Sequence, residues 1–479
     1  MKTRKVKIGS GSTASARAVV SVVIPVLNES ARIASVVRLA LRSPLVDEVL
    51  VLDDGSIDGT PELAASAGAR VITSTMLGKG GSLEDGLFAA RNEFILYLDG
   101  DLAGLRKDLV ERMVAPLVRD EADFVKASFS RRAGRVTVLT ARPLLRTYFP
   151  ELVHFEQPLG GIVAARRDLL RRLKFENDYG VDIGLLIDAS QAGARLAEVD
   201  IGHIEHDSHD LEYLGEMATQ VARTILDRAA ACGRLRPAFA ARVREKERLH
   251  RAHPETVISR ISRSGAVERL ALIDMDGTIL NGRFISELAR HTGREEALAR
   301  YLDRYDLTPE TRTRRIGALF RGVRRELFEK IALGIPLVKG AVEAVVGLRR
   351  RGYRVGVVTD SFHVASTIVR KRVFADFSLA NVMEFNHDRA TGVVTLAPTM
   401  RSDRKGRLAY DKLNALRFLV KRMGIAAKHV LAIGDGDNDV GMMRAAGMSV
   451  AFQPKTDRVR RAAKHVVMER LDEVLAFAP

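Results

Sequence analysis

Two short acidic motifs, each directly after a run of aliphatic residues, constrain the fold of this chain more than any other feature. Residues 274–278 read DMDGT after the run LALI, and residues 434–439 read GDGDND after VLAI, about 160 positions later. Such aliphatic runs are typical of buried strands, and carboxylates at the ends of parallel strands meet at one edge of a sheet. The motifs therefore predict an α/β domain whose sheet edge carries a cluster of acids.

A separate set of strand and acid signals occupies the first half of the chain. The runs at residues 19–27, 48–52 and 94–98 are aliphatic, and the last two precede DDGS and DGD. Helical patterns separate the runs, as in parallel α/β sheets, so we predict an α/β protein of two domains. The predicted boundaries are an unstructured basic tail over residues 1–18, a first domain over 19–230, an Arg-rich helical linker over 231–267 and a second domain over 268–479.

Composition excludes several classes of protein. The 479 residues are 46% hydrophobic and 28% charged, which is normal for a soluble globular protein. No aliphatic run approaches the ~20 residues that span a membrane, and the first residues lack the apolar segment of a signal peptide. The one cysteine, Cys232, excludes an internal disulfide framework and fits a reducing cytoplasm. The net charge of +16 comes from scattered arginines without interleaved aromatics, so we expect no nucleic-acid binding.

In the second half, four segments in order supply the groups of a phosphate-hydrolysing site. Asp274 can attack phosphorus, and Asp276 can protonate the leaving oxygen and then activate water. Thr359, at the end of the run RVGVVT, can bind phosphate through its hydroxyl, and Lys412 can neutralise a phosphorylated aspartate. Two later acids are hard oxygen ligands that suit Mg²⁺, namely Asp435 and Asp439.

These motifs resemble the haloacid dehalogenase superfamily, and their spacing resembles its phosphoserine-phosphatase branch, over residues 268–475. The resemblance implies a Rossmann-like fold, an aspartyl-phosphate at Asp274, acid–base work by Asp276, and phosphate contacts from Thr359 and Lys412. It also implies a small helical cap that selects the substrate, at about residues 282–345. The Mg²⁺ ligands that it implies are Asp274, the Asp276 carbonyl and Asp435, supported by Asn438 and Asp439.

One position departs from the phosphoserine enzymes. Those enzymes carry a Glu a few residues after the first motif, facing the amino group of the substrate, whereas the matching residue here is Arg283. A cation repels an ammonium group and attracts a carboxylate. We therefore predict a phosphorylated acid without a nearby amine as the substrate, and the alternative is that Arg283 is a solvated residue of the cap.

In the first half, segments at successive strand ends fit a sugar nucleotide. Pro25, Asn28 and Glu29 belong to the segment PVLNE at the end of the first strand, where a nucleobase and ribose can lie. The segment GKGGS at residues 78–82 offers flexible backbone and the ammonium of Lys79 to a diphosphate.

The acids of the DGD segment predict a metal in the same site. Asp99 and Asp101 follow the strand at residues 94–98 and present two carboxylates to a divalent cation. A cation that bridges the diphosphate stabilises the departing nucleotide. We expect Mg²⁺, with Mn²⁺ as an alternative.

The first half resembles GT-A-fold glycosyltransferases, and within them the glucosyl-3-phosphoglycerate synthase family, over residues 19–225. The stretches that carry the closer resemblance are residues 135–145, 150–161, 177–188 and 204–210. The family implies a nucleoside-diphosphate sugar donor, Mg²⁺ or Mn²⁺, and transfer with retention of anomeric configuration. The resemblance implies that Asp54 and Lys79 contact the nucleotide and that Asp101 and His206 bind the metal. It also implies that Arg135 and Thr137 contact the acceptor, and it places Asp182 at a position where the family usually has Glu.

Two stretches depart from that family near the acceptor or donor. The family has Ser-Gly-Glu after QPL, where this chain has Gly160, Gly161 and Ile162. It has an Asn/Arg-rich stretch after the metal-binding His, where this chain has residues 207–209 (DSH). The acceptor and the sugar are therefore left open, as are the donor base, the domain arrangement and a homodimeric state.

Taken together, the two halves predict consecutive reactions. We expect sugar transfer from a nucleoside-diphosphate sugar to a phosphorylated acceptor, 3-phosphoglycerate above others, giving glucosyl-3-phosphoglycerate, and then removal of the phosphate to give a glycosylglycerate. Tethering raises the local concentration of the intermediate. The alternatives are the same chemistries on another phosphorylated polyol or inositol, a polyprenyl-phosphate sugar transferase fused to an unrelated phosphatase, and a half that only binds or regulates.

Overall fold

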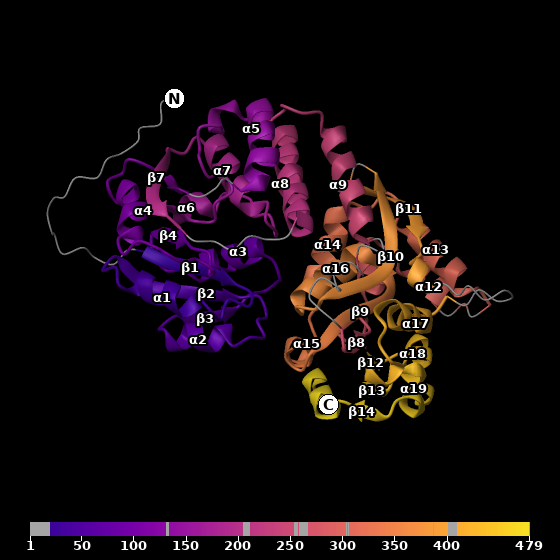
Figure 1. Cartoon of the computed structure of the whole chain (residues 1–479). Coiled ribbons are helices and arrows are strands. Elements are labelled where there is room, and N and C mark those ends of the chain that lie inside the picture. Colours follow the sequence, from indigo (N-terminus) through magenta and orange to yellow (C-terminus); the bar gives the residue numbers. More distant parts are fainter. Residues whose placement is uncertain are drawn as a thin grey trace. The chain divides into compact units, whose positions relative to one another are not determined.

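The computed structural model consists of two compact units, divided between Ala240 and Ala241 (Figure 1). This division lies within residues 231–267, the segment that we expected to link the domains. None of the helices in the described part of the chain is long and apolar enough to cross a membrane. The structure describes residues 20–130, 134–204, 211–252, 257, 267–302, 304, 306–386, 388–400 and 410–478.

The first unit contains a seven-stranded sheet in the order β3-β2-β1-β4-β6-β5-β7. All neighbouring strands are parallel except β6, which is antiparallel to both β4 and β5. The strands are β1 (Val20–Val26), β2 (Val46–Asp53), β3 (Arg70–Thr73), β4 (Phe94–Tyr97), β5 (Phe124–Ser130), β6 (Val163–Arg166) and β7 (Leu196–His203). The helices are α1 (Ile33–Leu41), α2 (Thr60–Ser66), α3 (Lys79–Ala89), α4 (Leu109–Val118), α5 (Arg142–Tyr148), α6 (Arg167–Leu170), α7 (Val181–Gln191) and α8 (Leu211–Ala231), while α9 (Pro237–Ala252) crosses the division.

Helices bury both faces of this sheet, which explains why its central strands are aliphatic without alternation. Val22 and Ile24 of β1 pack into a core that includes residues of α1 and α4. Val23, which points to the opposite face, packs into a second core with residues of α3, α5 and α7. A strand buried on both faces reads as a continuous apolar run, so the sequence pattern and the packing agree.

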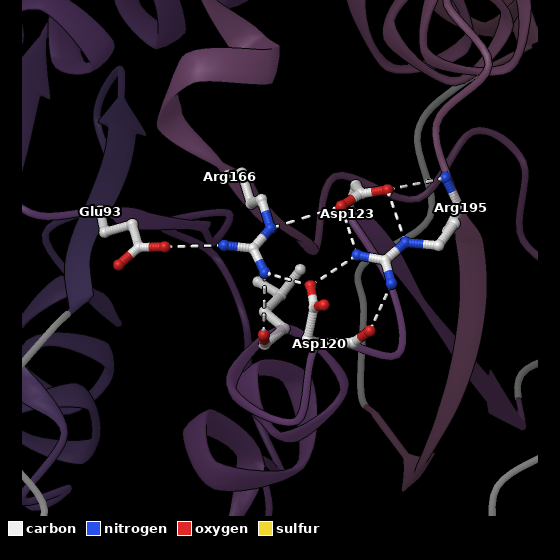
Figure 2. A network of polar contacts seen from close by, with 6 residues as sticks. Glu93, Asp120, Asp123, Arg166 and Arg195 are labelled. Atoms are coloured by element: carbon white, nitrogen blue, oxygen red, sulfur yellow. Dashed lines mark hydrogen bonds and ion pairs between the residues drawn. The ribbon is translucent and has the colours of Figure 1, made fainter.

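A network of ion pairs ties the strands together at one end of the sheet (Figure 2). The guanidinium of Arg166, at the end of β6, contacts Glu93 at 2.7 Å, Asp120 at 2.7 Å and Asp123 at 3.3 Å. Arg195, directly before β7, contacts Asp120 at 2.6 Å and Asp123 at 2.9 Å. Glu93, Asp123 and Arg195 directly precede parallel strands, so this network lies at the end of the sheet opposite the strand termini that carry the predicted site.

The second unit has a seven-stranded sheet in the order β11-β10-β9-β8-β12-β13-β14, parallel except for the β10–β11 pair. Its strands are β8 (Arg269–Ile273), β9 (Tyr353–Phe362), β10 (Phe377–Asn386), β11 (Arg389–Thr395), β12 (Val430–Gly434), β13 (Met448–Phe452) and β14 (His465–Val467). Its helices are α11 (Phe284–His291), α12 (Glu295–Leu302), α13 (Pro309–Leu319), α14 (Arg325–Gly334), α15 (Ala341–Arg350), α16 (His363–Arg372), α17 (Lys412–Met423), α18 (Val440–Ala445) and α19 (Asp457–Ala462).

Helices α11 to α14 occupy the stretch in which we expected a cap. Phe328 of α14 packs edge-on against Phe385 of β10, with ring centroids 5.2 Å apart, and lies 6.2 Å from Phe362 of β9. The segment between α13 and α14 also hydrogen bonds to β11, where Ala390 N donates to Val323 O at 2.8 Å. Aromatic packing and a backbone hydrogen bond therefore fasten α14 and the segment before it to the sheet.

Candidate functional sites

The ends of β8 and β12 bring three acids of the second unit together. Asp274 directly follows β8, and its backbone N–H donates to Ile433 O of β12 at 2.9 Å. Asp435 directly follows β12, and Asp439 lies one turn later. Carboxylate oxygens of Asp274, Asp435 and Asp439 lie within 4.8 Å of one another, and all three residues are buried. The structure thus places the predicted metal ligands side by side.

Lys412 completes this acidic cluster. It is the first residue of α17, whose N-terminus is capped by the side chain of Asp411. Its buried Nζ donates to Asp274 Oδ1 at 2.5 Å and to Asp439 Oδ1 at 2.7 Å. Burial lowers the pKa of Lys412, but the charges of Asp274 and Asp439 outweigh that effect and raise it above its ordinary value. Lys412 is therefore a cation held against the expected nucleophile.

The charge balance of the cluster fits a hard divalent cation. Burial and then the charge of Asp439 raise the pKa of Asp274 well above its ordinary value, although Lys412 opposes them. Three carboxylates face one buried ammonium, so the cluster carries an excess of negative charge. Oxygen-only ligands with such an excess suit Mg²⁺.

Lys455 is a residue of this site that the sequence analysis missed. Its Nζ lies 2.6 Å from Asp435 Oδ2, although its side chain is exposed. Its backbone N–H donates to Asp435 O at 2.9 Å, which fixes the loop after β13 against the end of β12. Gly277 leaves room for this pair, because a Cβ there would lie 2.1 Å from Asp435 Oδ2. The signal that could have found it is its place three positions after the apolar run at residues 448–452, which the sequence analysis did not interpret as a strand.

Asp276 has the environment of a proton donor. Its Oδ1 accepts a hydrogen bond from Phe284 N at 2.7 Å. Burial raises the pKa of Asp276 to about 6, the charge of Asp360 adds to this rise, and Phe284 N and Arg283 oppose it. A carboxyl group that titrates near neutral pH can both give and take a proton. Asp360, which also acts on Lys412, was not predicted as a site residue.

Thr359 is buried, and its Oγ1 accepts a hydrogen bond from Ser361 N at 3.1 Å. We expected the strand to end at Thr359, but β9 continues to Phe362 because β10 extends its pairing to that residue. Arg283 is exposed and, together with Asp435, lines a cavity of about 460 Å³. The other residues that line this cavity are Gly277, Leu280, Asn281, Gly282, Val338, Gln453 and Lys455.

In the first unit, three predicted residues from separate elements form an ion-paired triad. Lys79 is the first residue of α3, Asp99 follows β4, and Asp182 lies in the first turn of α7. Lys79 Nζ lies 2.7 Å from Asp99 Oδ1 and 3.0 Å from Asp182 Oδ2. Burial lowers the pKa of Lys79, but the two carboxylates raise it overall. The ammonium is thus held charged at the strand ends.

Asp54 orders the glycine-rich loop. Its carboxylate accepts hydrogen bonds from Gly78 N at 2.8 Å, from Ser82 Oγ at 2.5 Å and from Ser74 Oγ. The family resemblance places Asp54 on the nucleotide, but its oxygens are already bonded to the protein. The loop also packs closely, since a Cβ at Gly80 would lie 1.6 Å from Glu176 O. Its glycines are therefore required by packing as well as by flexibility.

The PVLNE segment lies beside the DGD acids. Asn28 has a φ of 61°, and its Oδ1 accepts a hydrogen bond from Ile57 N at 2.9 Å. Burial, and then the charges of Asp101, Asp58 and Asp99, raise the pKa of Glu29 to about 7. Pro25 pairs with Leu52 across β1 and β2. The charge of Asp101 thus acts on Glu29, and the role of Asp101 as a metal ligand stays a prediction.

The remaining predicted residues are only partly described. Arg135 is exposed and lies just before a short π-helical segment (Thr137–Ala141), in which Thr137 is buried. His206, predicted as a metal ligand, lies outside the described residues, as does the departure at residues 207–209. Ile162, which replaces a family Glu, packs into the apolar core at 1% exposure.

Gly161 lies against the ion-paired triad, and substituting it tests whether the triad needs this close contact. A Cβ at this position would lie 2.4 Å from both carboxylate oxygens of Asp99 and 2.5 Å from Lys79 Nζ. We expect Gly161→Ala to push the pair apart and to lower the sugar-transfer rate about 100-fold, as displacements near 1 Å do. Rates of nucleotide release measure the effect. Gly215→Ala is the matched control, because a Cβ there meets nothing within 4 Å. Equal rates for the two variants would contradict the prediction.

Comparisons with known proteins match both halves and confirm both resemblances. Residues 21–177 match the glycosyl transferase family 2, and residues 407–477 match the haloacid dehalogenase-like hydrolase family. The glucosyl-3-phosphoglycerate synthase of Mycobacterium tuberculosis (strain ATCC 25618 / H37Rv) is 39% identical over 253 residues, which cover 47% of this chain and 77% of that protein. The phosphoserine phosphatase of Streptomyces coelicolor is 33% identical over 213 residues, which cover 43% of this chain and 50% of that protein.

A second phosphatase and a solved structure extend the comparison. The phosphoserine phosphatase of Archaeoglobus fulgidus is 29% identical over 229 residues, which cover 46% of this chain and 62% of that protein. The chain thus spans about half to two thirds of the phosphatases. A crystal structure of the M. tuberculosis synthase with Mg²⁺ and uridine diphosphate shares 40% identity over 44% of this chain and 79% of that chain, with a TM-score of 0.43.

Proposed function

Through its first half, this chain belongs to the glucosyl-3-phosphoglycerate synthase family, and from this premise we propose that it joins sugar transfer to phosphate removal. The donor is a nucleoside-diphosphate sugar and the acceptor is 3-phosphoglycerate. The second half hydrolyses the phosphomonoester of the product, which leaves a glycosylglycerate. One observation carries the proposal: a synthase domain is followed in the same chain by buried Asp274, Asp435 and Asp439 around Lys412.

For the transfer, the bond between the sugar C1 and the diphosphate breaks, and a bond from C1 to the acceptor hydroxyl oxygen forms with retention. The proton of that hydroxyl passes to the departing diphosphate. Asp101 and His206 would hold the divalent cation, which offsets the charge of the departing diphosphate when bound. Lys79 would bind that diphosphate, and its ion pair with Asp182 at 3.0 Å would keep this acid in place. Arg135 and Thr137 would contact the phosphorylated acceptor.

For the hydrolysis, a carboxylate oxygen of Asp274 attacks phosphorus while the leaving hydroxyl takes a proton from Asp276. Asp276 then takes a proton from the water that cleaves the aspartyl-phosphate. Thr359 binds the phosphoryl oxygens, and Lys412 offsets the charge on Asp274. Mg²⁺ held by Asp274, the Asp276 carbonyl and Asp435, with Asp439 in support, would polarise the phosphoryl group. Arg283, exposed beside this site, would favour a substrate carboxylate over an ammonium.

A second candidate keeps both chemistries but changes the acceptor to another phosphorylated polyol or inositol. The observation in its favour is Ile162, which packs into the apolar core where the family carries a Glu. A buried aliphatic side chain makes no polar contact with an acceptor. The acceptor side of this chain therefore differs from that of the family.

An assay that follows nucleotide and phosphate separately tests the proposal. We would incubate the full chain with Mg²⁺, a uridine or guanosine diphosphate sugar, and 3-phosphoglycerate or another phosphorylated polyol. The proposal expects nucleotide release first, then phosphate release, and neither without an acceptor. Phosphate release from 3-phosphoglycerate without the sugar nucleotide would contradict the order. Faster hydrolysis of phosphoserine than of any phosphorylated hydroxy acid would contradict the role of Arg283.

Removing the metal should affect both halves. We expect chelation with EDTA to lower both rates by about 100-fold or more, because each site balances an excess of carboxylate charge with a cation. Adding Mg²⁺ should restore both rates. It should also raise the thermal unfolding midpoint of the second unit, since a ligand that binds only the folded state stabilises it. Full phosphatase activity in EDTA would contradict the assigned cluster.

A further inference from the structure

Lys126 is a fully buried ammonium group in the first unit that none of the roles above explains. It lies in β5, between β6 and β7, and its exposure is 0%. Its Nζ donates to Gly160 O at 2.6 Å. Burying a lysine is costly unless nearby groups compensate for its lost hydration. The buried ammonium of Lys126 therefore needs compensating groups nearby.

The charges around Lys126 are those of the triad. Burial lowers the pKa of Lys126 to about 8; the charges of Asp182, Asp99 and Glu198 oppose this fall, and the charge of Lys79 adds to it. Lys79 pairs with Asp99 at 2.7 Å and with Asp182 at 3.0 Å. The charges of Asp99 and Asp182 thus act on Lys126 as well as on Lys79.

The hydrogen bond of Lys126 also connects it to the triad, through the backbone of residues 160 and 161. Its acceptor, Gly160, directly precedes Gly161, and a Cβ on Gly161 would lie 2.4 Å from the oxygens of Asp99. Gly160 N donates to Gln157 O at 3.0 Å, which makes the segment a tight turn. The hydrogen bond from Lys126 therefore holds the turn that lies against Asp99 and Lys79.

We propose that Lys126 is a positioning residue for sugar transfer, which holds the turn at Gly160 and Gly161 against Asp99 and Lys79. This inference rests on the proposed transferase function. The nucleobase and ribose contacts are assigned to the end of β1, two strands away from β6 and three from β5. Loss of Lys126 should therefore lower kcat much more than it raises the KM for the sugar nucleotide.

The test compares Lys126→Met, which keeps the length of the side chain, with Lys126→Ala. We expect kcat for nucleotide release to fall about 100-fold in both, as misplacement of a catalytic group does, with the donor KM within threefold of wild type. Ethylammonium, which fits the space opened in Lys126→Ala, should raise its kcat about tenfold, but it should not help Lys126→Met. Val125→Ala is the control, because Val125 is a buried neighbour that packs in the core on the other face of the sheet.

The outcomes separate this inference from the function on which it rests. If wild type releases nucleotide but Lys126→Met keeps kcat within threefold, the inference is wrong and the function stands. If Lys126→Ala loses no more kcat than Val125→Ala and ethylammonium has no effect, Lys126 only fills space, and the inference is also wrong. If wild type itself releases no nucleotide with any phosphorylated acceptor, the proposed function fails first.

Discussion

Replacing Asp274 by Asn should stop phosphate release while sugar transfer continues, so that the phosphorylated glycoside accumulates. An amide cannot form the aspartyl-phosphate, and its neutral oxygen no longer matches the ammonium of Lys412 at 2.5 Å. Loss of a covalent nucleophile costs a factor of about 10⁴ to 10⁶ in rate. Separate assays of nucleotide and phosphate, with mass spectrometry of the accumulated product, measure the effect. The change is isosteric, so we expect the second unit to stay folded.

The matched control for this change lies in the other acidic motif of the site. Asp437, between Asp435 and Asp439, is exposed, and its carboxylate accepts a hydrogen bond from Thr456 Oγ1 at 3.0 Å. Asp437→Asn should keep phosphate release within a few-fold of wild type. If Asp274→Asn retained a tenth of the wild-type rate, Asp274 would not be the nucleophile. If it also lost nucleotide release, the two sites would not be independent.

Replacing Lys79 by Met should abolish sugar transfer and leave phosphate removal intact. The change removes the only cation that directly pairs with both Asp99 and Asp182 among the described residues. Removal of one partner from a largely buried ion pair costs about 3–5 kcal/mol, so the two acids would separate or take up protons. The diphosphate also loses its ammonium contact, and we expect transfer to fall about 1,000-fold. Nucleotide release, and hydrolysis of added phosphorylated glycoside, measure the two activities.

Lys107→Met serves as the control, because Lys107 is an exposed lysine of the same unit. It should keep both activities. Circular dichroism and the unfolding midpoint show whether Lys79→Met still folds. If the folded variant transferred sugar at more than a tenth of the wild-type rate, the triad would not be the centre of the transferase site.

The sequence was most informative about functional residues that directly follow a strand. Asp274 and Asp435 were expected together because each follows an aliphatic run, and β8 and β12 do lie side by side and parallel. Each of the three was proposed separately: Lys79 from the glycine-rich segment, Asp99 from a strand end and Asp182 from the family resemblance. Their meeting within 2.7 and 3.0 Å was not predicted as an ion-paired triad.

The sequence was least informative about groups whose role depends on packing. Asp54 looked like a nucleotide contact, yet it bonds Gly78, Ser74 and Ser82. The sequence analysis assigned no role to Lys126, because nothing in its local sequence shows that its side chain is buried. Lys455 likewise depends on the pairing of β12 with β13, which brings its loop to Asp435.

By itself, the sequence determined that the chain has two α/β domains and which strand ends carry acids. It also determined the two families that the domains resemble. These features are local, because backbone preferences and hydrophobic runs act over a few neighbouring residues. The tertiary structure alone decided which charges are buried together, which carboxylate faces which ammonium, and which glycine must lack a side chain. Coulomb interactions and desolvation depend on distance and burial in space, and residues as far apart as Lys79 and Asp182 come within 3.0 Å only when the chain has folded.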